Sequence, residues 1–166
     1  EGTYPLPEAQ LDRFFLRLQL GYPGPEEEVR ILDAQRVVHP VDTLEQVMTE
    51  EDLLEAQTIA RDVHLAEAVK TYVVSVVSAT RSHPDVYLGA SPRGSLALAR
   101  AAQAYAALRG RDYVIPDDVK ALAVPALAHR LILQPQARLR DLAATSVVAE
   151  ILASVPVELS AAAVRR

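Results

Sequence analysis

Apolar residues recur at the spacing of an α-helix through most of this chain, and this periodicity restricts the fold more than any other feature. It is clearest over residues 66–81, where positions i, i+3, i+4 and i+7 carry Val69, Tyr72, Val73, Val76, Val77 and Thr80. The valine-rich run 73–77 also fits a strand, so the choice of a helix there depends on the spacing. Half of the 166 residues are apolar, which is enough for one ordinary core.

Start and stop signals divide this pattern into about five or six helices, which predicts a mostly α-helical bundle. Proline suits the first helical position, and serine or threonine suits the position before it. The predicted helices begin, in chain order, at Pro25, Thr49, residue 66, Ser91, Pro116 and residue 145. Gly110 should end the helix that follows Ser91. Pro125 should kink or break the helix that follows Pro116.

The first 24 residues follow a different pattern. Residues 8–12 suit a short helix after Pro7. Apolar and other side chains then alternate over Phe14–Leu20, which is the period of a half-buried strand. Glycine and proline are dense over residues 21–25, which predicts a turn or hinge.

A single strand cannot form a sheet, because its backbone groups need a partner strand. We therefore expect Phe14–Leu20 to pair with a second copy, to pack on the helices or to belong to a domain outside this sequence. The predicted organisation is a helix–strand stub with a hinge over residues 1–24, a helical domain over 25–157 and a loose tail over 158–166.

Composition argues against several classes of protein. The chain has no cysteine, and none of its four histidines lies three or four positions from another, so no metal site is expected. No apolar run approaches the roughly 20 residues of a membrane span. The net charge is −5 with acids and bases interspersed, so nucleic acid is not an expected partner.

No catalytic motif is complete. The sequence contains no Gly-x-x-x-x-Gly-Lys-Ser/Thr loop to hold phosphates. Ser91 follows Gly89 by two positions, but Arg93 stands where a nucleophile elbow needs its second glycine. Ser91 is therefore predicted to cap a helix that begins at Pro92, and the chain to lack a complete catalytic centre.

Two arginines stand out by position. Arg13 lies where the short helix meets the predicted strand, so it either reaches a phosphate on a neighbouring molecule or pairs at the surface with Asp12 or Glu8. Arg93 lies in the first turn of a helix, where the dipole favours acids and anions rather than bases. It therefore either serves an anionic ligand or bridges to a neighbouring helix.

Several stretches resemble the MoxR family of AAA+ ATPases, in order and at compatible spacing. They are residues 1–14 (EGTYPLPEAQLDRF), Thr80-Arg81 with Leu88 to Arg93 (LGASPR), residues 108–120 (LRGRDYVIPDDVK) and His129-Arg130-Leu131. The resemblance covers nearly the whole chain, to about Pro156. The magnesium-chelatase ATPase subunits are similar but more distant.

This resemblance implies a helical AAA+ lid domain preceded by the last helix and strand of an α/β ATPase domain. It implies that Arg13 is an arginine finger acting on ATP bound by the next subunit of a ring. It implies that Arg93 is a sensor-2 arginine, which with Ser91 and Pro92 faces the ATP of its own subunit. The cofactors implied for the full protein are ATP and Mg²⁺.

In that family, the segments that bind ATP and Mg²⁺ precede the stretch that begins at Glu1. We therefore expect no ATP hydrolysis and no tightly bound cofactor in these residues alone. The resemblance also implies a cytoplasmic, chaperone-like machine that forms a ring, expected to be a hexamer, and acts on client or von Willebrand A-type domain proteins. The alternatives are a magnesium-chelatase-type motor subunit and a helical protein-interaction module that never contacts nucleotide.

Overall fold

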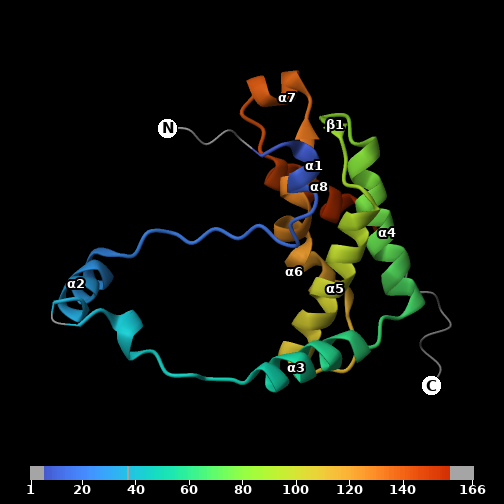
Figure 1. Ribbon diagram of the computed structural model, residues 1–166. Helices are drawn as coiled ribbons and strands as arrows, with labels where there is room; N and C mark the ends of the chain where they lie inside the picture. The colour runs from blue at the N-terminus through green and yellow to red at the C-terminus, as the bar shows by residue number, and fades with distance from the viewer. Residues whose placement is uncertain (1–5, 37, 158–166) are drawn as a thin grey trace. The chain divides into compact units, whose positions relative to one another are not determined.

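The computed structural model describes residues 6–36 and 38–157. Helices dominate these residues, which confirms the predicted mostly α-helical class (Figure 1). The chain divides into two compact units: one combines the chain up to Arg17 with the chain from Gln57 onward, and the other is Leu18–Ala56. The predicted boundary after residue 24 stays a prediction, and the predicted tail, residues 158–166, lies outside the described residues.

Four helices form the body of the larger unit (Figure 1). They are α4 (Glu67–Ser82), α5 (Pro92–Leu108), α6 (Pro116–Leu127) and α8 (Ala144–Ser154). α5 packs against α4 and α6, and α8 packs against the same two helices. The largest fully buried apolar side chains of the resulting core are Leu98, Leu127, Ile151, Val76, Val77, Val119, Val147 and Val148.

The valine-rich run of α4 is helical. All six residues predicted for its apolar face are buried, namely Val69, Tyr72, Val73, Val76, Val77 and Thr80. Val74 falls outside that spacing and is 54% exposed. The 3.6-residue period therefore outweighs the strand preference of valine, because only a helix places these six side chains on the core.

Shorter elements complete the larger unit. They are α1 (Glu8–Leu11), β1 (Val86–Leu88), the 3₁₀ helix η2 (Ala128–Arg130), β2 (Ile132–Leu133) and α7 (Pro135–Leu139). β1 and β2 pair antiparallel, with Val86 opposite Leu133 and Leu88 opposite Ile132. The sequence did not predict this pair, because strands of two or three residues are too short to show a period.

Three exposed helices follow Gly24, and the last of them begins in the smaller unit and continues past its end at Ala56. α2 (Pro25–Ala34), the 3₁₀ helix η1 (Pro40–Thr43) and α3 (Glu50–Asp62) bury no side chain. The predicted start near Thr49 is confirmed, because the Asp52 N–H donates to Thr49 Oγ1 at 3.1 Å and the Thr49 N–H donates to Asp52 Oδ2 at 2.8 Å. Local capping rather than burial therefore defines where α3 begins.

The predicted strand over residues 14–20 does not form. A strand needs a second strand alongside it, and within the described ranges the paired strands of a sheet are β1 and β2. The backbone N–H of Arg17 instead donates to the carbonyl of Pro125 at 2.9 Å. Leu16 packs against the helical core, in agreement with the expectation that this segment could pack on the helices.

No helix in the described part of the chain is long and apolar enough to cross a bilayer. Within the same residues, no group of three or more histidine, aspartate or glutamate side chains is arranged to hold a metal ion.

Candidate functional site

Ser91 caps α5, as the sequence predicted. Its backbone is extended, and its Oγ accepts a hydrogen bond from the Arg93 N–H at 3.1 Å. Pro92 occupies the first helical position. An N–H group there would have no acceptor within the helix, and proline has no N–H group. Arg93 is thereby fixed in the first turn of α5, where unpaired backbone N–H groups and the helix dipole favour an anion.

The loop before Ser91 is tied to the end of α4. Thr80 Oγ1 donates to the Val77 carbonyl at 2.6 Å and accepts from the Ala90 N–H at 3.0 Å. Arg81 Nε donates to the Ala90 carbonyl at 2.8 Å. A Cβ at Gly89 would lie 2.7 Å from the backbone of Thr80 and Arg81, so only glycine allows this approach. These contacts determine where α5, and with it Arg93, begins.

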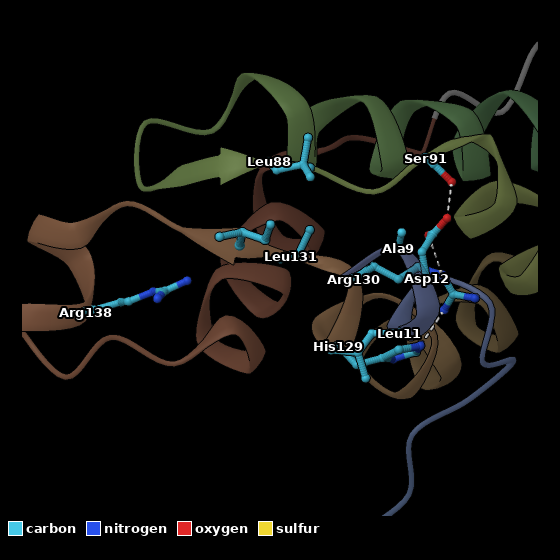
Figure 2. A pocket seen from close by; sticks show the side chains of 11 residues that line it. Ala9, Leu11, Asp12, Leu88, Ser91, His129, Arg130, Leu131 and Arg138 are labelled. Carbon is cyan, nitrogen blue, oxygen red and sulfur yellow. Dashed lines mark hydrogen bonds and ion pairs between the residues drawn. The ribbon is translucent and has the colours of Figure 1, made fainter. Parts of the chain in front are cut away.

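Asp12, directly after α1, connects three groups of the site, and Figure 2 shows two of them, Ser91 and Arg130. Its Oδ2 accepts a hydrogen bond from Ser91 Oγ at 2.9 Å and lies 4.0 Å from Arg93 Nη1. Its Oδ1 lies 3.3 Å from Arg130 Nε. This carboxylate therefore links the N-terminal segment to the start of α5 and to η2.

Arg130 anchors the segment that follows α1. Its side chain is 2% exposed, and its Nη2 donates to the Phe14 carbonyl at 2.6 Å. Burial lowers the pKa of Arg130, and the adjacent Asp12 opposes that shift. His129 Nε2 lies 3.1 Å from the same Phe14 carbonyl, and burial lowers the pKa of His129 as well. A buried guanidinium and a half-buried imidazole thus hold Arg13 and Phe14 against the helical body.

Arg13 and Arg93 line the same hollow, of about 350 Å³. The other lining residues are Asp12, Phe15, Leu96, Ala97, Arg100 and Arg130. Arg13 is exposed and, among the described side chains, forms no ion pair. Arg93 is 59% exposed and makes only the 4.0 Å approach to Asp12. Arg13 is therefore available to an anion in the hollow, and Arg93 is held there only by its long ion pair with Asp12.

The surface pairing of Arg13 with Asp12 does not occur, because Asp12 bonds to Ser91 and Arg130 instead. A second, more apolar hollow of about 460 Å³ (Figure 2) shares Asp12 and Arg130 with the first among its lining residues. It lies between α1, β1 and the η2–β2 segment, with Leu88, Leu131 and Ile132 among its lining residues.

The sequence predicted Ser91, Pro92, Arg93 and Arg13 as site residues, but not Asp12, Arg100, His129 or Arg130. His129 and Arg130 belong to a stretch that resembles the family, which is the signal that could have drawn attention to them. Arg100 follows Arg93 by seven positions, so the two share one helix face. Asp12 also lies in such a stretch, but its partners Ser91 and Arg130 are far away in the sequence, so no local pattern could indicate them.

Comparison with known proteins identifies what this chain is similar to. The AAA lid domain family matches residues 78–151. The chain is 50% identical over 165 residues to the uncharacterized protein YeaC of Bacillus subtilis, covering 99% of this chain and 52% of that protein. It is 42% identical over 164 residues to chaperone MoxR1 of Mycobacterium tuberculosis, covering 93% and 43% respectively.

A solved structure of a candidate ATPase from Cytophaga hutchinsonii superposes with a TM-score of 0.87 and 32% identity. That match covers 95% of this chain and 50% of the other. The helical unit that carries Ser91 and Arg93 is an AAA lid domain. These matches support the resemblance to the MoxR family of AAA+ ATPases that the sequence predicted. The chain spans about half the length of the curated relatives it matches.

Proposed function

We propose that this chain is the nucleotide-responsive lid region of a MoxR-type machine that uses ATP hydrolysis to remodel or mature partner proteins. The observation that supports this most is that Arg13 and Arg93, both exposed, line one hollow. A guanidinium group binds phosphate oxygens with two parallel hydrogen bonds and keeps its charge at any physiological pH. The hollow is therefore suited to the phosphates of a nucleotide.

Arg13 is proposed as the arginine finger that acts on ATP bound by a neighbouring subunit. Such a residue stabilises charge in the transition state and contributes roughly 10³–10⁵ in rate. Arg93 is proposed as the sensor-2 arginine, with Ser91 and Pro92 fixing its position. Since the two arginines line the same hollow, we expect both to approach one phosphate chain, that of the ATP bound by the neighbouring subunit. The resemblance instead assigned Arg93 to the ATP of its own subunit.

The lining of the hollow suits phosphate and does not suit Mg²⁺. Four arginines and one carboxylate line it, whereas Mg²⁺ needs carboxylate, phosphate or water oxygens around it. The sequence also contains no phosphate-binding loop of the Walker type. ATP turnover by these residues alone is therefore not expected, and Mg²⁺ and most phosphate contacts would come from other parts of the machine.

A ring of subunits, expected to be a hexamer, follows from an arginine finger that acts between subunits. Client proteins or proteins with von Willebrand A-type domains are the proposed partners, and the cytoplasm is the proposed compartment.

The test is ATP turnover by the complete gene product, with Arg13→Ala and Arg93→Ala compared with wild type. Arg138→Ala is the matched control, because Arg138 is exposed on α7 and does not line the arginine hollow. Loss of turnover in both variants but not in the control supports the proposal. Mixing Arg13→Ala subunits with subunits that retain the arginine but cannot bind ATP should restore turnover. If both variants hydrolyse ATP normally, the proposal is wrong, and the chain is better explained as a helical protein-interaction module.

A further inference from the structure

Arg100 lies on the same face of α5 as Arg93. Seven residues make about two helical turns, so the two arginines are roughly 10 Å apart along the axis with almost the same orientation. Leu96 and Ala97 fall between them on that face, and all four residues line the hollow that Arg13 also lines. One wall of the hollow is therefore a continuous stripe of α5 with an arginine near each end.

Among the residues that the structure describes, Arg100 has no ion-pair partner to account for its position. It is exposed, and no described carboxylate lies within ion-pair distance of it. Two other arginines of the same unit are paired, Arg140 with Asp85 and Arg111 with Asp118.

Positive charge is concentrated in this hollow, although the whole chain carries a net charge of −5. Four guanidinium groups face a single carboxylate, Asp12, which is already bonded to Ser91 and paired with Arg130. Arg130 is almost fully buried and cannot swing out to solvent. Like charges held this close repel one another, and an anion bound between them removes that repulsion.

We propose that Arg100 is a third phosphate-binding arginine, which extends the site of Arg13 and Arg93 so that it binds a polyphosphate chain rather than a single phosphate. The proposal rests on the proposed function, because it assigns the anion to the same nucleotide. The backbone positions of Arg93 and Arg100 lie about 10 Å apart along the helix, so a di- or triphosphate, which offers oxygens over a longer span than a single phosphate does, suits both arginines. An acidic protein segment is the competing anion, but a hollow of about 350 Å³ is of small-ligand size.

The first test uses the chain itself and inorganic anions. Tripolyphosphate and orthophosphate are titrated calorimetrically into wild type, Arg100→Gln, Arg100→Lys and the control Arg138→Gln. Arg100→Gln should weaken tripolyphosphate binding about tenfold, because a charge-assisted hydrogen-bond pair is lost, and should change orthophosphate binding far less. Arg100→Lys should recover part of the affinity for tripolyphosphate, since lysine keeps the positive charge but lacks the planar guanidinium that donates two parallel hydrogen bonds. Equal thermal unfolding of the variants verifies folding.

Tripolyphosphate binding that is the same in Arg100→Gln and Arg138→Gln overturns the proposal. It is also overturned if Arg100→Gln weakens binding of a polyglutamate peptide while leaving tripolyphosphate unchanged, since the surface would then recognise protein.

ATP turnover by the complete gene product separates this proposal from the proposed function. Arg100→Gln should raise the KM for ATP about tenfold with a smaller change in kcat, because the contact is made before the transition state. If Arg13→Ala and Arg93→Ala abolish turnover while Arg100→Gln matches the control, the role of Arg100 is wrong and the proposed function stands. If all three match the control, both proposals fail.

Discussion

The Asp12 carboxylate accepts a hydrogen bond from the Ser91 hydroxyl at 2.9 Å across a separation of 79 positions in the sequence. Because Ser91 also caps α5 and Asp12 directly precedes Arg13, this contact joins the backbones that carry the two proposed phosphate-binding arginines. A shift of α1 relative to α5 must therefore break or stretch it. The relationship makes Asp12 a positioning residue for the site and a source of stability.

Replacing Asp12 with asparagine should destabilise the larger unit by about 1–3 kcal/mol, because buried Arg130 then lacks its counter-charge while Ser91 can keep an acceptor. The free energy of unfolding in urea measures this. The control is Asp85→Asn, which breaks an exposed pair with Arg140 and should change stability by about 0–1 kcal/mol. Equal effects of the two substitutions would contradict the role given to Asp12.

Gly89→Ala should destabilise the chain by about 1–3 kcal/mol, because the added Cβ would lie 2.7 Å from the backbone of α4. The start of α5 must then move. Gly21→Ala is the matched control, since nothing lies within 4 Å of its Cβ, and it should stay within about 0.5 kcal/mol of wild type. Thermal unfolding of both variants is the measurement, and a neutral Gly89→Ala would mean that the loop adjusts freely.

Asp118 should make the free energy of unfolding depend on pH in the acid range. Burial raises its pKa, but the Arg111 guanidinium, at 2.6 and 2.8 Å, and the Ile115 N–H together lower the pKa below its ordinary value of 3.8. A carboxylate with a lowered pKa stabilises the fold above pH 3.8, and that contribution disappears as the pH falls through the lowered value.

Asp118→Asn should therefore flatten the dependence of stability on pH below 3.8. Urea unfolding at several acid pH values measures this. Asp117→Asn, which removes the neighbouring exposed carboxylate, should leave the slope nearer to that of wild type. An unchanged slope in Asp118→Asn would contradict the contribution assigned to this pair.

His129 should make the attachment of the segment around Phe14 sensitive to mildly acid pH. Burial lowers its pKa below the ordinary value of 6.5, so the unfolded chain takes up a proton before the folded one does. Stability is therefore fully present above pH 6.5 and falls as the pH drops through the lowered value. His129→Gln should remove this part of the pH dependence, as followed by urea unfolding, whereas His64→Gln, at an exposed position, should retain it.

The sequence alone determined where most helices begin and end. Ser91 and the Thr49–Asp52 pair cap helices as predicted, and Gly110, with φ of 71°, follows the end of α5. These features could be read from the sequence because a cap or a helical turn involves residues only a few positions apart. The family could be recognised for a related reason, since its characteristic stretches are each local and occur in order.

Tertiary structure decided the rest. The strand period of Phe14–Leu20 did not produce a strand, because pairing depends on a neighbouring strand that no local pattern supplies. The arginines that line the hollow come from three parts of the chain: Arg13 from the segment after α1, Arg93 and Arg100 from α5, and Arg130 from η2. Packing of the helices on one core brings these cations together around Asp12. The seven-residue spacing places Arg93 and Arg100 on one helix face, but no spacing along the chain could have revealed that Arg13 and Arg130 join them.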